Sequence, residues 1–147
     1  MEIAKNRKAR FNYEVLETYE AGIELQGTEV RSCRNKSISI SEGFVSFENG
    51  EAWLRETHIS TYEQGNRNNH EPKRKRRLLL HKKEIKEIRE ALDERRLTLV
   101  PLSLNIRRGR AKIELGIARG LKNYDKRRKI QEREQNRQIA RALRHSI

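Results

Sequence analysis

Apolar and polar residues alternate over much of the first half of the chain, the period of strands with one buried face. The alternation begins at Phe11 and returns at Ile23, after a break at Ala21-Gly22. We therefore expect two strands that meet near Gly22. Residues 28–34 lack this period, and we expect a short helix there with Thr28 as its N-cap.

Two turn sequences predict hairpins. Asn49-Gly50 separates the apolar-rich segments 44–48 and 51–54, and Asn-Gly tolerates the positive φ angles of a type I′ turn. Arg108-Gly109 separates a strand over 97–106, interrupted at Pro101, from its return strand over 111–117. Both pairs of segments should therefore be antiparallel neighbours in a sheet.

A helical period lies between these hairpins. Ile85, Ile88 and Leu92 recur at helical spacing within residues 81–96, which predicts a helix of about four turns. Its single apolar stripe is enough to plug one end of a sheet or barrel.

The pattern predicts a mainly β protein. Roughly six short antiparallel strands with one intervening helix favour a small closed barrel over a doubly wound sheet. We expect an OB-type antiparallel β-barrel with short helices over residues 1–120, and a basic, flexible C-terminal tail over 121–147. The tail has few large aliphatic residues and should be disordered when free, although its composition would support a helix on a charged template. Such barrels often bind nucleic acid, but fold alone does not establish that function.

Charge is divided unevenly along the 147 residues. The chain has 34 Lys and Arg against 21 Asp and Glu, a net charge of +13, and only 34% of its residues are hydrophobic. Residues 64–83 carry eight basic residues and one acidic residue, and 119–147 carry ten and three, whereas 11–63 carry four and ten. This segregation indicates directed surfaces for phosphate, although solvated faces whose charges cancel locally are the alternative.

Several protein classes do not fit the sequence. No apolar run approaches the length of a membrane span, and the first ten residues lack the apolar stretch of a signal peptide. A single cysteine, Cys33, excludes an internal disulfide framework and a cysteine-clustered zinc site. We expect a cytoplasmic, monomeric protein with a polyanionic partner and no membrane association.

Catalytic motifs do not emerge. The histidines have no metal-ligand spacing, there is no nucleophile elbow or glycine-rich phosphate loop, and the acidic residues of 11–63 are too scattered to locate a two-metal site. Cys33 fits a buried small apolar residue better than a reactive thiol. We therefore expect no enzymatic activity, metal or cofactor. The four histidines are His58, His70, His81 and His145.

Residues 61–77 are the strongest candidate for binding nucleic acid. They lack apolar periodicity and should form an exposed loop whose Arg, Lys and Asn side chains can reach phosphate, sugar and base edges. A solvated loop or a nuclear localisation signal, matched by PKRKRR, are the alternatives. In the tail, Tyr124 either stacks on a base or docks as a cap on the barrel.

Motifs along nearly the whole chain, all in order, resemble the small protein B family, the tmRNA-binding (SsrA-binding) proteins of bacterial trans-translation. The resemblance implies an OB-type barrel that binds the tRNA-like domain of tmRNA. With the elongation factor that delivers aminoacyl-tRNA, the complex would enter the A site of a ribosome stalled on truncated mRNA, where the RNA encodes a degradation tag. The motifs are LETYEAGIELQGTEVRS (16–32), ENGEAWL (48–54), 58–85 with YEQGNRNNHEPKRKRRLLLHKKEI, LTLVPL (97–102), and ARG with KNYDKR (118–127).

Residue by residue, Glu20, Leu79, His81 and Asn66-Arg67 fall on RNA-binding positions of the family. From their types alone, Glu20 could instead be a structural carboxylate and Leu79 a core residue. The full set that we expect to bind RNA is Asn6, Arg7, Lys8, Glu20, Gly22, Asn66, Arg67, Asn69, His70, Arg74, Arg76, Leu79 and His81. The tail residues that we expect to contact the small-subunit decoding centre and mRNA channel are Gly120, Lys122, Tyr124, Asp125, Lys126 and Arg127.

Three positions depart from the family pattern. Lys36 stands where a glycine is usual, Leu121 where a second lysine is usual, and Cys33 where a leucine is usual. The alternatives to tmRNA binding are a ribosomal RNA-binding or ribosome-assembly protein with the same barrel, and an RNA-processing enzyme.

Overall fold

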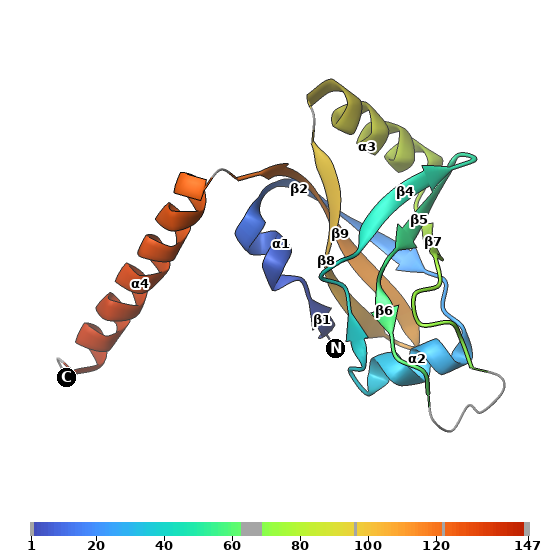
Figure 1. Cartoon of the computed structure of the whole chain (residues 1–147), viewed down its shortest axis with the longest axis horizontal. Coiled ribbons are helices and arrows are strands. Elements are labelled where there is room, and N and C mark those ends of the chain that lie inside the picture. Colours follow the sequence, from blue (N-terminus) through green and yellow to red (C-terminus); the bar gives the residue numbers. More distant parts are fainter. Residues whose placement is uncertain (1, 63–68, 96, 122, 146–147) are drawn as a thin grey trace.

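An antiparallel sheet carries most of the fold. The computed structural model describes residues 2–62, 69–95, 97–121 and 123–145 (Figure 1). The elements in chain order are β1 (Glu2–Lys5), α1 (Arg7–Asn12), β2 (Tyr13–Ile23), α2 (Gly27–Arg34), β3 (Ile38–Ser39), β4 (Phe44–Glu48), β5 (Glu51–Arg55), β6 (His58–Ile59), β7 (Arg76–Leu79), α3 (Lys82–Arg95), β8 (Thr98–Arg107), β9 (Arg110–Gly120) and α4 (Asn123–His145).

The large sheet has the strand order β1-β8-β9-β2-β7-β5-β4, and β3 pairs with β6 in a small second sheet. The mainly antiparallel β prediction is confirmed. β4 approaches β8 across the curled sheet, but no strand pairing among the described residues joins the two edges. The closed barrel expected from the sequence is therefore not shown.

The core lies on the inner face of this sheet. Ile113, Leu115 and Ile117 alternate along β9 and are buried, as the sequence pattern predicts. Ile88 of α3 is fully buried in the same cluster, so the predicted helix does contribute its apolar stripe to the core. Cys33 of α2 is also fully buried, which confirms the prediction of a buried small apolar residue, and burial raises the pKa of its thiol to about 11.

Both predicted hairpin turns are present. Asn49 and Gly50 have φ angles of 51° and 76°, and Arg108 and Gly109 have the same pair of values. Positive φ at both central residues is the type I′ geometry.

The predictions for the first 30 residues need three corrections. Phe11 belongs to α1 rather than to a strand, because Asn6 caps this helix by accepting the Ala9 N–H at 3.0 Å. β2 runs unbroken through Gly22, which pairs with strands on both sides. The N-cap of α2 is Gln26 rather than Thr28.

Lys36 ends α2 in a left-handed conformation, with a φ of 57°. The Ser37 N–H donates to the Ser32 carbonyl at 3.0 Å and the Lys36 N–H to the Cys33 carbonyl at 2.9 Å, which closes the helix end. Glycine adopts this φ without steric cost. Lys36 in place of the usual glycine therefore leaves the turn intact, but its backbone is strained.

The C-terminal segment forms α4, an arm that extends from the end of β9 past α1 and away from the sheet (Figure 1). The helix agrees with the composition of the tail. That the tail is disordered when free stays a prediction, as does the division of the chain at residue 120.

Candidate nucleic-acid interface

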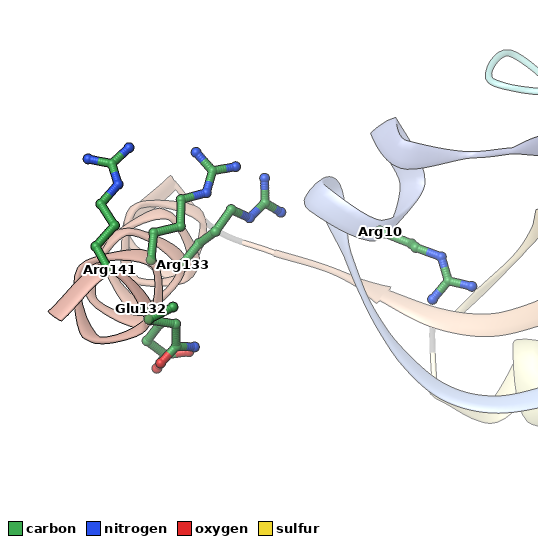
Figure 2. Close-up of a pocket in the computed structure, with 7 residues that line it drawn as sticks. Arg10, Glu132, Arg133 and Arg141 are labelled. Carbon is green, nitrogen blue, oxygen red and sulfur yellow. The ribbon is translucent and has the colours of Figure 1, made fainter. Parts of the chain in front are cut away.

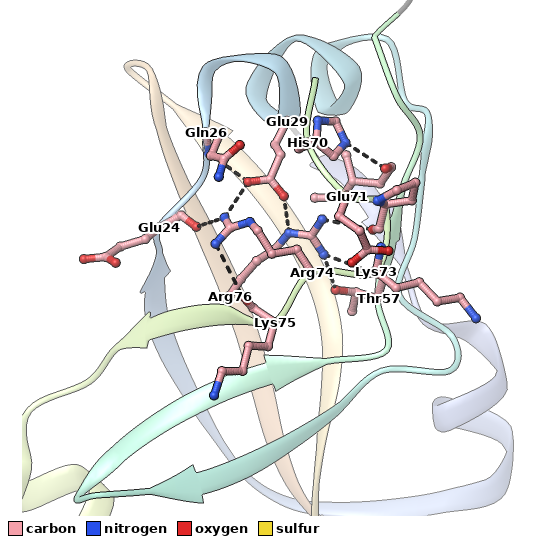
Figure 3. A network of polar contacts seen from close by, with 12 residues as sticks. Glu24, Gln26, Glu29, Thr57, His70, Glu71, Lys73, Arg74, Lys75 and Arg76 are labelled. Carbon is pink, nitrogen blue, oxygen red and sulfur yellow. Dashed lines mark hydrogen bonds and ion pairs between the residues drawn. The ribbon is translucent and has the colours of Figure 1, made fainter. Parts of the chain in front are cut away.

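The basic run 73–77 is divided between the surface and the interior. Lys73 and Lys75 have side chains 59% and 45% exposed and point outward, whereas Arg74 is 30% exposed and Arg76 is fully buried (Figure 3). Arg76 begins β7, in which Arg76 and Leu78 are buried and Arg77 and Leu79 are more exposed, the alternation of a strand with one inner face. An exposed loop through residue 77 was the wrong prediction.

A buried carboxylate explains the inward arginines. Glu29, in the first turn of α2, accepts from Arg76 Nε through one oxygen and from Arg74 Nη2 at 2.6 Å through the other (Figure 3). Arg76 also donates to the Thr57 carbonyl and to the Pro72 carbonyl, each at 3.0 Å. Because these groups satisfy it, the guanidinium can lie in the core.

The environment of Glu29 sets its ionisation. Burial alone would raise the pKa of this carboxyl group. The hydrogen bonds from Arg74 and from the Gln26 N–H, together with the charge of Arg76, outweigh burial and hold the pKa below its ordinary value. Glu29 is therefore an ionised anchor for the basic run.

A second buried contact fixes the segment just before the run. His70 lies between the Thr28 hydroxyl, 2.8 Å from its Nδ1, and the Ile59 carbonyl, 2.8 Å from its Nε2. A carbonyl only accepts, so Nε2 donates to Ile59. Asn69 exchanges hydrogen bonds with the backbone of Tyr62, whose N–H donates to Asn69 Oδ1 at 3.0 Å.

Three residues in the set expected to bind RNA are buried. Asn6 caps α1 and donates to the Pro101 carbonyl at 2.8 Å, and His70 and Arg76 are held as described above. Their side chains are buried and hydrogen-bond to groups of the protein itself, so they hold the structure beneath the surface and cannot contact a ligand directly. Asn66 and Arg67 lie outside the described residues.

Four other positions of that set form one patch. Gly22 on β2 lies directly opposite Leu79 on β7, and Glu20 is two residues earlier on the same face. His81 follows two residues after Leu79, is exposed, and donates its backbone N–H to Glu84 Oε1 at 3.1 Å at the start of α3. Leu79 is 49% exposed, which rules out the alternative that it is a core residue.

A groove of about 360 Å³ opens beside this patch. Leu25 and Val30 give it an apolar lining, and Arg110 and Lys112 of β9 supply cations. Lys112 pairs with Gly22 on the side of β2 opposite to Leu79, so the three residues form a row across the sheet. Its full lining is Gly22, Ile23, Leu25, Val30, Leu79, Gly109, Arg110, Ala111 and Lys112.

The sequence reasoning did not include Val30, Arg110 or Lys112 in the site. Alternation within 110–117 places Arg110 and Lys112 on the face opposite to the buried aliphatic residues. Their position beside Gly22 depends on the pairing of β9 with β2, which the local pattern does not specify.

Arg7 and Lys8 lie elsewhere. They are exposed on α1, before the start of β2, whereas Gly22 is near its end. A cleft of about 910 Å³ separates α1 from α4, and Figure 2 shows Arg133 extending from α4 toward α1. The lining residues are Arg10, Glu132, Arg133, Asn136, Arg137, Ala140 and Arg141.

The tail positions are only partly described. Gly120 ends β9 and is exposed, and Lys126 and Arg127 lie near the start of α4. Tyr124 and Asp125 belong to α4, but their side chains, like Lys122 as a whole, lie outside the described residues. Base stacking by Tyr124 stays a prediction.

The described part of the chain has neither a membrane-spanning helix nor a cluster of metal ligands. No helix there is long and apolar enough to cross a membrane. Within the same residues, no group of His, Cys, Asp and Glu side chains could hold a metal ion.

The chain is similar to known proteins over almost its whole length. A sequence profile of the family described as "SmpB protein" matches residues 3–145. The chain is 52% identical over 143 residues to the SsrA-binding protein of Levilactobacillus brevis, with 97% of this chain and 91% of that protein covered. It is 54% identical over 142 residues to the SsrA-binding protein of Carboxydothermus hydrogenoformans, with 97% and 95% covered.

A solved structure is also similar. It is described as "tmRNA-SmpB: a journey to the center of the bacterial ribosome", and the matching chain has a TM-score of 0.69 at 48% identity. The match covers 82% of this chain and 85% of that chain.

Proposed function

The chain belongs to the SmpB protein family, and we propose that it binds the tRNA-like domain of tmRNA and delivers it to the A site of stalled ribosomes. This activity is trans-translation: the stalled ribosome is rescued and the incomplete polypeptide is tagged for degradation. The proposal is a binding function in the cytoplasm rather than catalysis.

The patch around Gly22 and Leu79 is the observation that carries the proposal. It combines an exposed leucine, a glycine whose lack of a side chain leaves room for that leucine, and a groove with apolar walls and two cations. Folded RNA is recognised at loops and corners, where unstacked bases meet apolar side chains and phosphates meet Arg and Lys. Glu20 on the same face would accept hydrogen bonds from base or ribose donors, because phosphate would repel its carboxylate.

Arg7 and Lys8 lie with the tail rather than with this patch. Together with Arg10 and the arginines of α4, they form a second cationic surface beside the cleft between the two helices. We propose that this surface contacts ribosomal RNA in the vacant decoding centre and mRNA channel, where the tail would order on its template. A full-length mRNA would occupy that channel and exclude the tail.

The proposal separates the partners by position. The patch on the sheet would hold tmRNA, on which the elongation factor that delivers aminoacyl-tRNA would also bind, and the tail residues Gly120, Lys126 and Arg127 would contact the ribosome. The chain would act as a monomer.

Translation of an mRNA that lacks a stop codon tests this function. A purified translation system with tmRNA should append the degradation tag only when the chain is added, and ribosomes should then be released. Untagged product in the presence of the folded chain and intact tmRNA would contradict the proposal.

A further inference from the structure

Glu29 is shared by two arginines that differ in how fully they are bound. Arg76 is fully buried, and all three of its guanidinium nitrogens donate: to Glu29, Thr57 and Pro72. Its role is confined to the interior, because no part of the side chain is exposed.

Arg74 is bound less completely. Its Nη2 donates to Glu29 Oε1 at 2.6 Å and, at 3.4 Å, to the Glu24 carbonyl, and its Nη1 makes a contact of 3.3 Å with the Lys75 carbonyl. Its Nε is buried and has no hydrogen-bond partner among the described residues. One carboxylate, Glu29, therefore faces two guanidinium groups, so the three side chains together keep one positive charge. Of the two arginines, Arg74 is the one that reaches the surface.

The neighbours of Arg74 in sequence are surface cations. Lys73 and Lys75 point outward on either side of it (Figure 3). Each is within 4.0 Å of a glutamate, Lys73 of the exposed Glu56 and Lys75 of the half-buried Glu48, so their charges are partly balanced near the protein surface. The excess charge of Arg74 is balanced by no second carboxylate in the network described here.

We infer that Glu29 is a positioning residue for RNA binding, which holds the Arg74 guanidinium in one orientation so that its remaining Nη1 N–H meets an RNA phosphate between Lys73 and Lys75. An arginine fixed in this way loses little side-chain freedom when it binds. The inference rests on the proposed function and adds a residue that never touches the RNA.

The direction in which RNA affinity changes when Glu29 is substituted tests the inference. Removing a carboxylate beside an RNA surface should strengthen binding if charge alone matters. Glu24 is the matched control, since it is an exposed carboxylate that pairs with Arg77 at 3.4 Å in the same region. Glu24→Gln should leave RNA affinity unchanged or raise it, whereas Glu29→Gln should lower it about tenfold, the loss of one well-oriented contact.

Affinity for the tRNA-like domain is measured by titration, at a temperature where melting curves show each variant to be folded. Glu29→Asp keeps the charge and should recover most of the affinity. A folded Glu29→Gln that binds as tightly as the unaltered chain, or more tightly, would overturn the inference.

Substitutions of Arg74 keep the test decisive if Glu29→Gln does not fold. Arg74→Gln should lower affinity about tenfold and reduce the slope of log affinity against log salt by about one. Arg74→Lys should keep the slope but not the affinity, because an ammonium cannot serve Glu29 and a phosphate with the same fixed geometry. Arg89→Gln on α3 is the matched control and should change neither quantity.

Arg74→Lys with unaltered affinity would also overturn the inference. If the unaltered chain failed to bind the tRNA-like domain, the proposed function would be at fault instead. The same variants would then be compared on a plain A-form RNA duplex, where the phosphate contact alone predicts the same order of affinities.

Discussion

Gly22 on β2 lies directly opposite Leu79 on β7, and a Cβ atom at position 22 would come within 3.2 Å of the Leu79 side chain. This approach is tight, although the far end of a leucine can move. Gly22 therefore leaves room for Leu79 in the conformation that places it at the surface. The pair sits at the centre of the patch that we propose for tmRNA.

Gly22→Ala should displace Leu79 and lower affinity for the tRNA-like domain several-fold, with a change in unfolding free energy below about 1 kcal/mol. Leu79→Ala should lower affinity as well and cost little stability, since the side chain is half exposed. Gly27→Ala is the control, because a Cβ at position 27 meets nothing within 4 Å. Equal affinities of the Gly22 and Gly27 variants would contradict the proposed role of the pair.

Lys36→Gly should stabilise the chain by about 0.5–1 kcal/mol, because glycine removes the strain of a side chain at a φ of 57°. The gain is limited by the larger entropy of glycine in the unfolded chain. Asn35→Gly, one residue earlier at a φ of −82°, has no such strain to relieve and should destabilise. Chemical denaturation measures both, and a less stable Lys36→Gly chain would refute this account of the helix end.

Glu29 predicts a loss of stability in acid. Its pKa in the folded chain is lowered, so its contribution is present above the unfolded pKa and is lost as pH falls through the folded value. The melting temperature should therefore decrease at pH values below about 4, the range in which an ordinary glutamate takes up its proton. Glu29→Gln should cost about 3 kcal/mol at neutral pH and flatten this fall.

Melting curves at pH 7, 5 and 3.5 check this prediction. Glu42→Gln is the control, since Glu42 is an exposed carboxylate that pairs with Lys8 at 2.8 Å on α1. Identical pH profiles for the unaltered chain and the Glu29 variant would show that the buried ion pair does not set the acid sensitivity.

The two proposed surfaces predict separable losses. Deletion of residues 120–147 removes α4 and its arginines but none of the patch around Gly22 and Leu79. Binding of the tRNA-like domain should be preserved, whereas tagging on stalled ribosomes should be abolished. Titration and a tagging assay on the same preparation measure the two, and loss of both together would contradict the division.

The parts of the fold that follow from local physics could be predicted from the sequence. The buried stripe of β9 and the turn at Asn49-Gly50 depend on neighbouring residues alone, and both are present. Lys36 also shows that this turn is set locally, because it keeps its positive φ even without the usual glycine.

The errors arose where a distant partner decides the outcome. Arg76 lies in a segment with the composition of an exposed loop, and its burial depends on the charge of Glu29, 47 residues earlier in the chain. Asn6 resembles a surface amide, but it caps α1 and reaches a carbonyl 95 residues away. Charge in the sequence alone therefore does not say which side chains of the basic run are exposed, since pairing and burial divide the run between surface and interior.

Competition between RNAs tests the central claim most directly. Labelled tRNA-like domain is bound to the full chain and displaced by unlabelled tRNA-like domain, ordinary tRNA or a ribosomal RNA fragment, at two salt concentrations, with RNA integrity followed on gels. The account predicts that the tRNA-like domain competes at least tenfold better than the other two at both salts, and that all RNAs stay intact. Equal competition by ordinary tRNA, preference for the ribosomal fragment, or cleavage of the RNA would contradict it.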